Sequence, residues 1–253
     1  MLRPRIIPCL LIKDGGLVKT VNFSNPKYVG DPINVVKILN EKEVDELIVL
    51  DISSTTSGQL LNYQLIENIA TECRMPLCYG GGISNVEQIK RLISLGVEKV
   101  SVSSAIFDDD KFLIEASKIV GNQSIAVVLD VRYINKDYYI FIGNGLKNTG
   151  IQLFDFINKL LNYGIGELVI NSIDRDGTML GYDFDLIQKV KSLINIPLSV
   201  IGGASSHENI NELFKKFGQI GAGVGSLFVF KGKYKAVLVN YPTGIEKLQI
   251  LNF

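Results

Sequence analysis

The sequence predicts an α/β fold, a single (β/α)8 barrel over residues 1–253, on the strength of two patterns. In the first, short apolar, β-branched runs alternate with amphipathic segments of helical period, such as NVVKILNEK and DFDLIQKVKSLI. The eight apolar runs lie at 5–12, 46–53, 76–82, 99–105, 124–131, 167–174, 197–203 and 221–228. Buried-type strands that are each followed by a helix are typical of a closed parallel barrel. Because no Pro/Ser-rich or charged linker interrupts the chain, one domain is favoured.

The second pattern is an internal duplication. At an offset of 121 positions (167 − 46), Glu46-Leu47 falls on Glu167-Leu168. At the same offset MPLCYGGGIS (75–84) falls on IPLSVIGGAS (196–205), and one position further Ser103-Ser104 falls on Gly225-Ser226. Three matches in order at nearly one offset indicate a repeat. The sequence therefore predicts two half-barrels of four strand–helix units each.

The composition argues against several classes of function. The 253 residues carry 26 basic and 26 acidic side chains, and this zero net charge gives no electrostatic case for a nucleic-acid partner. No apolar run reaches the length of a membrane span. The short apolar run near the N-terminus is followed by Lys13 and Asp14, without a small-residue cleavage site. We therefore expect a cytoplasmic protein with no membrane or nucleic-acid partner.

Histidine and cysteine usage gives no support for a metal site or a cofactor, and we predict neither. Cys9, Cys73 and Cys78 have no zinc-binding spacing and form no even disulfide set, so we predict three buried or half-buried thiols. His207 is the only histidine, and its context SSHEN predicts an exposed first turn of a helix. A single imidazole excludes histidine-rich metal sites and catalysis that needs more than one histidine.

The carboxyl ends of the predicted strands carry two similar sets of small residues. In a barrel, functional groups lie at these strand ends. The first set follows strands three and four and the second follows strands seven and eight: Gly81, Gly82, Ser103 and Ser104, then Gly202, Gly203, Gly225 and Ser226. Glycines let a phosphate approach backbone N–H groups. The alternative is that they only turn strands into loops, but the repeated placement favours two phosphate cradles and an elongated ligand with a phosphate at each end.

A reacting centre is expected between the two cradles. Asp130 ends the fifth apolar strand, SIAVVLD, where a dry pocket would raise its pKa and suit it to general acid or base catalysis. A helix cap or a hydrogen-bonded loop residue is the alternative. The half-barrel repeat places Leu11 at the matching end of strand one. One carboxylate thus lies where the symmetry would accommodate two.

Two further segments contribute candidate binding residues at the same end of the barrel. In SIDRDGT (172–178), Asp176 and Gly177 predict a tight turn, and Asp176 is a candidate to orient ligand groups. Lys19 lies in a long segment after strand one, where Gly15-Gly16 predict a mobile lid. Lys19 either reaches a phosphate from this lid or remains solvated. The segment 130–145 resembles a hairpin that covers part of the mouth.

Four residues of alternating charge begin strands one, two, four and six: Arg5, Glu46, Lys99 and Glu167. They predict a ring of ion pairs across the other end of the barrel. Because that end of a barrel usually carries stability rather than catalysis, the residues by themselves favour a structural role.

Along nearly its whole length the sequence resembles the cyclase subunit of imidazole glycerol phosphate synthase, HisF. The diagnostic stretches are RIIPCL, KDG, ELIVLDI, GGGI, KVS, KNTG, SIDRDGT and GGA. The resemblance implies a barrel that docks a HisH-like glutaminase on its bottom face. It also implies that ammonia travels from that partner through the barrel to a phosphate-binding mouth. On this basis Arg5, Glu46, Lys99 and Glu167 become the ammonia entrance gate.

The sequence departs from the family at the mouth. Family cyclases carry an aspartate at the position of Leu11, which pairs with the one matching Asp130 as the acid/base pair of the cyclase step. Leucine cannot transfer a proton. Three further departures affect the phosphate shells: Ser103-Ser104 replace Asn-Thr, Asn171 replaces Thr, and Ile201 replaces Ser.

The combination of a kept gate and a broken catalytic pair resembles a side branch of the family that acts in surface-sugar biosynthesis. It predicts a barrel subunit that conducts ammonia from a HisH-like glutaminase for conversion of an N-acetyl group to an acetamidino group. A sugar amidotransferase and a phosphorylated small molecule are the expected further partners. The alternatives are a true imidazole glycerol phosphate synthase cyclase (a lyase) of histidine biosynthesis and a stand-alone phosphosugar isomerase. A solitary isomerase would need no gate.

Overall fold

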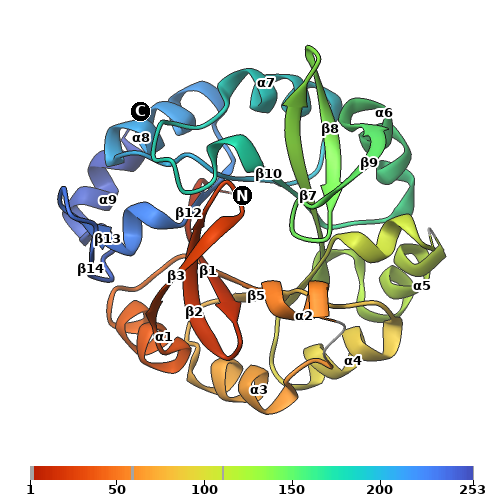
Figure 1. Cartoon of the computed structure of the whole chain (residues 1–253), viewed down its shortest axis with the longest axis horizontal. Helices are drawn as coiled ribbons and strands as arrows, with labels where there is room; N and C mark the ends of the chain where they lie inside the picture. The colour runs from red at the N-terminus through yellow and green to blue at the C-terminus, as the bar shows by residue number, and fades with distance from the viewer. Residues whose placement is uncertain (1–2, 58–59, 110, 253) are drawn as a thin grey trace.

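The computed structural model describes residues 3–57, 60–109 and 111–252. Within these ranges, eight parallel strands close into a barrel, because β7 pairs with β10 and β12 pairs with β1 (Figure 1). The barrel strands are β1 (Arg5–Lys13), β4 (Leu47–Asp51), β5 (Leu77–Gly80), β6 (Lys99–Val102), β7 (Ile125–Ile134), β10 (Glu167–Ser172), β11 (Leu198–Ile201) and β12 (Gly221–Val224). They coincide with the eight predicted apolar runs, so the predicted (β/α)8 barrel is confirmed.

Helices surround the barrel as an outer ring (Figure 1). They are α1 (Pro32–Glu41), α3 (Tyr63–Glu72), α4 (Val86–Ser94), α5 (Lys111–Val120), α6 (Leu153–Leu160), α7 (Phe184–Leu193), α8 (His207–Phe217) and α9 (Gly244–Leu251), with a short α2 (Ile52–Ser57) directly after β4. Several begin at a side chain that caps a free backbone N–H group, such as Asp31 for α1 and Ser206 for α8. His207 opens α8, so its predicted place in a first helical turn is confirmed, but its side chain is half-buried and not exposed as predicted.

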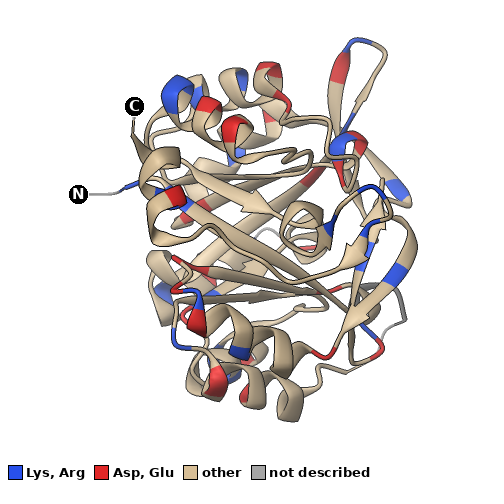
Figure 2. Ribbon diagram, turned by 90° about the vertical axis from the view of Figure 1, so that its left-hand side faces the viewer, with Lys and Arg blue, Asp and Glu red and all other residues tan. Residues whose placement is uncertain are grey.

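Each half of the barrel begins with a three-stranded antiparallel sheet. β2 (Gly16–Val21) and β3 (Ser24–Gly30) extend β1, whereas β8 (Asp137–Ile142) and β9 (Lys147–Gln152) extend β7. The hairpin of β7 and β8 projects from the end of the barrel that lies away from the N-terminus (Figure 2). The repetition of this meander at residue 5 and again at residue 125 supports the predicted half-barrel duplication. A short pair, β13 (Phe230–Lys231) and β14 (Ala236–Val237), lies near the C-terminus.

The segment that carries Lys19 is a strand and not the predicted long loop. Asp14 and Gly15 both have positive φ, 51° and 80°, and they join β1 to β2 in a two-residue turn. This geometry matches the right-handed twist of paired strands and suits Asp-Gly. Pairing on both sides, with β1 and with β3, holds the backbone of Lys19 in the sheet. The prediction of a loop-like lid at Lys19 was therefore wrong.

Two apolar clusters fill the molecule. The larger lies between the barrel and the helices and includes residues from both layers. The smaller is formed by alternate residues of the barrel strands, which a two-residue period directs into the barrel: Ile7, Cys9, Ile48, Cys78, Ala126, Val128, Val169 and Ile201. Cys9 and Cys78 are buried and Cys73 is half-buried, and all three thiols are free, as predicted.

Candidate functional site

A cavity of about 810 Å³, here called the mouth cavity, opens at the carboxyl ends of the barrel strands. It brings together all the residues that the sequence placed at this end: Leu11, Lys19, Gly81, Gly82, Ser103, Ser104, Asp130, Asp176, Gly177, Gly202, Gly203, Gly225 and Ser226. A cavity of this size matches a small-molecule ligand. The individual roles of these residues remain predictions.

The first cradle (Gly81, Gly82, Ser103 and Ser104) and the second cradle (Gly202, Gly203, Gly225 and Ser226) have matching backbones. The four glycines after β5 and β11 have φ values of +110°, +69°, +100° and +97°. Ser103 and Gly225 likewise share an unusual conformation, with ψ near −85° and −92°, and each precedes a short 3-10 turn. Backbone packing also requires glycine, since a Cβ atom on Gly81 would lie 2.1 Å from the carbonyl oxygen of Asp51. Close backbone packing alone therefore imposes glycine at this position.

Asp130 lies near the carboxyl end of the cavity-facing part of β7 and is half-buried. Removal of its carboxyl from water raises its pKa from 3.8 to about 7, although a hydrogen bond from Asn171 opposes this shift. The Asn171 Nδ2 group donates to Asp130 Oδ1 at 2.9 Å, across the register that pairs these two residues of β7 and β10. The sequence identified Asn171 only as a departure in a phosphate shell, and its contact with Asp130 was missed.

Asp130→Asn is expected to stabilise the protein at alkaline pH. Because the folded-state pKa lies above the unfolded value, ionisation of Asp130 removes stability as the pH rises from about 4 through 7. The substitution should raise the free energy of unfolding by about 1–3 kcal/mol at pH 8.5, allowing for partial exposure, and change it little at pH 4. Urea denaturation at both pH values tests this. A difference that does not vary with pH would contradict it.

Leu11 lines the cavity with a half-buried side chain, and two carboxylates of the same cavity, those of Asp51 and Asp176, are engaged by hydrogen bonds. The Asp51 carboxylate accepts hydrogen bonds from the hydroxyl groups of Ser53 at 2.7 Å and Ser54 at 2.8 Å. Asp176 Oδ2 accepts from the Thr20 hydroxyl at 2.7 Å and from the backbone of Phe23 at 3.2 Å. Asp176 thus binds the β2–β3 hairpin through these two hydrogen bonds, and its carboxylate is not free.

Lys19 points into the barrel and is buried, so the alternative of a solvated lysine was wrong. Its Nζ group donates to the carbonyl oxygen of Cys9. A Cβ atom built on Gly225 would lie 3.1 Å from this Nζ, which places the amine beside the second cradle. Burial lowers the pKa of Lys19, and an anion at the second cradle would offset that loss.

The charges around the mouth cavity are unequal. Of the described residues that line it, Lys19 is the one basic side chain, whereas the acidic ones are Asp51, Glu87, Asp108, Asp109, Glu115, Asp130 and Asp176. Asp108, Asp109 and Glu115 are exposed and follow the first cradle along the chain. We call Asp108, Asp109 and Glu115 the acidic rim. The sequence analysis missed it, although the run Asp108–Asp110 begins only four residues after Ser104.

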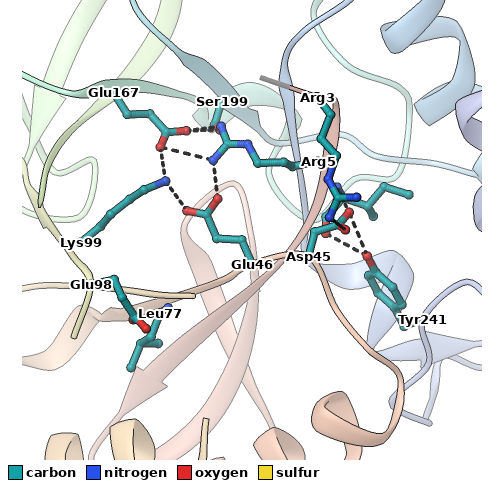
Figure 3. Close-up of polar contacts among 11 residues, drawn as sticks. Arg3, Arg5, Asp45, Glu46, Leu77, Glu98, Lys99, Glu167, Ser199 and Tyr241 are labelled. Atoms are coloured by element: carbon teal, nitrogen blue, oxygen red, sulfur yellow. Dashed lines mark hydrogen bonds and ion pairs between the residues drawn. The ribbon is translucent and has the colours of Figure 1, made fainter. Parts of the chain in front are cut away.

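At the opposite end of the barrel, the four predicted charged residues form a closed ring of ion pairs (Figure 3). Lys99 Nζ lies 2.7 Å from both Glu46 and Glu167, and the Arg5 guanidinium lies 2.7 Å from Glu167 and also contacts Glu46. Arg5, Lys99 and Glu167 begin β1, β6 and β10, whereas Glu46 immediately precedes β4. The predicted ring is confirmed.

The ring is held as ions. Burial raises the pKa of Glu167, but Arg5 and Lys99 outweigh it and keep that pKa below its ordinary value. The Ser199 hydroxyl adds a hydrogen bond to Glu167 at 2.5 Å. Two cations and two carboxylates cancel, so the ring closes this end with polar groups but no net charge.

The closed barrel of eight parallel strands, with a ligand-sized cavity at their carboxyl ends, places the chain among the (β/α)8 barrel proteins. The family model described as "Histidine biosynthesis protein" matches residues 5–235. This chain belongs to the HisF family of that group.

Full-length relatives agree with this membership. The chain is 52% identical over 253 residues to "Putative imidazole glycerol phosphate synthase subunit hisF3" of Vibrio vulnificus, covering 99% of this chain and 97% of the relative. It is 50% identical over 249 residues to the putative subunit HisF of Leptospira borgpetersenii, covering 98% of each. The putative subunit hisF2 of Pseudomonas aeruginosa is 44% identical over 254 residues, with 99% and 100% covered.

The described residues contain neither a grouping of metal ligands nor a helix suited to crossing a membrane. No cluster of three or more histidine, cysteine, aspartate or glutamate side chains within them is arranged to hold a metal ion. None of their helices has the length and apolar character that crossing a membrane requires.

Proposed function

We propose that this chain is the ammonia-conducting barrel subunit of a cytoplasmic glutamine amidotransferase. A HisH-like glutaminase would dock at the ring end, and ammonia would pass through the barrel to the mouth cavity. There it would serve the amidation of an N-acetyl sugar that carries phosphate, together with a sugar amidotransferase. The observation that carries the proposal is the combination of an intact ring at one end with Leu11 in place of a carboxylate at the other.

The interior of the barrel suits neutral ammonia. From the ring toward the mouth cavity, the barrel interior is lined by small or apolar side chains, with Ala126, Val128 and Val169 among them. Gly221 and Gly223 face the same interior and add no side chain. Neutral NH3 crosses such a region far more easily than ammonium, because burial of an unpaired cation is costly. The ring would then be the polar entrance at which the partner's ammonia is received.

The mouth favours a ligand with an anion at one side only. Lys19 lies beside the second cradle, so we place a phosphate there. The acidic rim next to the first cradle would repel a second phosphate. This differs from the elongated bisphosphate that the two cradles alone predicted, and it supports a changed substrate.

The second candidate is the cyclase of imidazole glycerol phosphate synthase, a lyase. The names of the relatives and the retained Asp130 favour it.

Ala126→Met tests the conduit. The chain is combined with the HisH-like glutaminase and the sugar amidotransferase of the same genome, and nitrogen transfer is followed by mass spectrometry with ¹⁵N-amide glutamine or ¹⁵N-ammonium. Methionine at this buried interior position should block transfer from glutamine and leave transfer from ammonium unchanged. Ala126→Ser, of nearly the same size, is the control. Equal loss from both nitrogen sources, or no transfer by the natural protein, would contradict the proposal.

A further inference from the structure

We propose that Asn171 and Asp130 together form a binding site for a nitrogen group that donates hydrogen bonds through its N–H groups, ammonia or an amidinium, on the floor of the mouth cavity. The inference rests on the proposed function for its biological ligand. It concerns a different observation, namely two hydrogen-bond acceptors on neighbouring residues that line the same cavity. It also assigns a role to a residue at which this chain departs from its family.

The side-chain oxygen of Asn171 is the first acceptor. Asn171 is 5% exposed and lines the mouth cavity, and its Oδ1 atom has no hydrogen-bond partner among the described residues. The orientation of the amide follows from chemistry, since only the NH2 group can face an ionised carboxylate. Nδ2 therefore donates to Asp130, and Oδ1 is left as a buried acceptor without a donor in the wall of the cavity. A buried acceptor without a donor is costly, and a ligand that supplies an N–H group would remove that cost.

The second acceptor is the other oxygen of Asp130. The Asn171 amide occupies Oδ1, whereas Oδ2 accepts no hydrogen bond from the described residues. The two residues are paired in register on the neighbouring strands β7 and β10, so both acceptors belong to one patch of the wall. An amidinium has N–H groups on two nitrogens in one plane and can span two such acceptors. Ammonia bound through two N–H groups would keep its lone pair free for reaction.

The surroundings favour a cation over an anion at this patch. The cavity wall carries seven carboxylates against Lys19, and Asp176 lies close enough to raise the pKa of Asp130. Val128, Ile201 and Leu11 line the cavity without polar atoms in their side chains, which strengthens a charge-assisted hydrogen bond. A phosphate at this patch would meet acceptors and no donor. The phosphate and the nitrogen group of the ligand must therefore lie apart, the former at the second cradle.

Acetamidinium chloride is the probe, titrated into the chain at pH 8 while the side-chain amide signals are followed by NMR. A saturable shift of the Asn171 amide is expected. Tetramethylammonium, a cation without N–H donors, should produce none. Asp130→Asn and Asn171→Leu should each weaken binding by about tenfold, the effect of one lost charge-assisted hydrogen bond. Asn144→Ser removes another amide of the cavity wall and should leave the affinity unchanged.

Equal affinity for acetamidinium in the natural protein and in both site variants would overturn the inference, and so would the absence of any saturable shift. Circular dichroism checks that each variant is folded. Binding also requires the ionised form of Asp130, so the affinity should fall between pH 8 and pH 6. Because the titration needs neither glutaminase nor sugar, its outcome is independent of the nitrogen-transfer assay. Loss of transfer with intact acetamidinium binding would refute the proposed function alone.

Discussion

Leu11→Asp is expected to raise turnover of the bisphosphate substrate of imidazole glycerol phosphate synthase by about 10²–10⁴-fold over the natural protein, with ammonium as nitrogen source. The reason is that one positioned acid/base group typically contributes a factor of this size. The other member of the pair is already present, since Asp130 lies at the cavity with its pKa near 7. The half-buried side chain of residue 11 faces the same cavity.

The matched control is Leu11→Asn, which has nearly the same shape as the aspartate but transfers no proton. It should remain at the level of the natural protein. The double variant Leu11→Asp with Asp130→Asn should lose the gain, because the pair acts as a unit. High turnover by the natural protein would mean that Leu11 does not impair the cyclase. The second candidate function would then replace the first.

The acidic rim limits the gain in turnover that Leu11→Asp can give. If the first cradle no longer holds the second phosphate, the Leu11→Asp variant will show a raised KM for the bisphosphate. Asp108→Asn and Asp109→Asn remove two carboxylates that line the cavity near this cradle. Added to Leu11→Asp, they should lower KM without changing kcat, because they alter uniform binding rather than proton transfer.

The fold was predictable because its signals are local. A short apolar run predicts each strand, and the helical period of apolar residues predicts each helix. The alternating order of these units then predicts a barrel. The ring was predictable for a related reason, since charges at the starts of parallel strands meet at one end. The position of Lys19 was missed because it depends on pairing between β1, β2 and β3, although Asp14-Gly15 is a recognisable hairpin turn.

The site was predictable in its parts but not in its contacts. Leu11, Asp130 and both glycine pairs could be named from strand ends and from the repeat. The contact between Asn171 and Asp130 could not be predicted, because it depends on the register between β7 and β10, which lie far apart in sequence. The excess of acidic over basic residues around the cavity could not be predicted either. Glu87 and Asp108 both line the cavity, but they reach it from different elements, α4 and the end of the turn at Ser104–Phe107.

Lys99→Met is expected to lower the free energy of unfolding by about 3–5 kcal/mol at pH 7, because it leaves two buried carboxylates with only one cation. Glu46 and Glu167 would share one cation, Arg5, where the natural ring has two. Their side chains are only 5% and 6% exposed, so water compensates little. Urea denaturation measures the loss.

The double variant Lys99→Met with Glu167→Gln is the control that separates charge from packing. It restores neutrality around the Arg5–Glu46 pair and should recover most of the lost stability. A double variant no more stable than Lys99→Met would show that the ring does not act through its charges.

At acid pH, the free energies of unfolding of the natural protein and of Lys99→Met should differ less than at pH 7. The lowered pKa of Glu167 contributes stability that is present above about pH 4.5 and is lost as the pH falls through its folded-state pKa. Without Lys99, that pKa is less depressed and there is less stability to lose.

The double variant also tests the ring as an entrance for ammonia. If it is stable but no longer transfers nitrogen from glutamine, while it still transfers nitrogen from free ammonium, the ring acts as the entrance. Unchanged transfer from glutamine would restrict the ring to the structural role that its residues alone suggested.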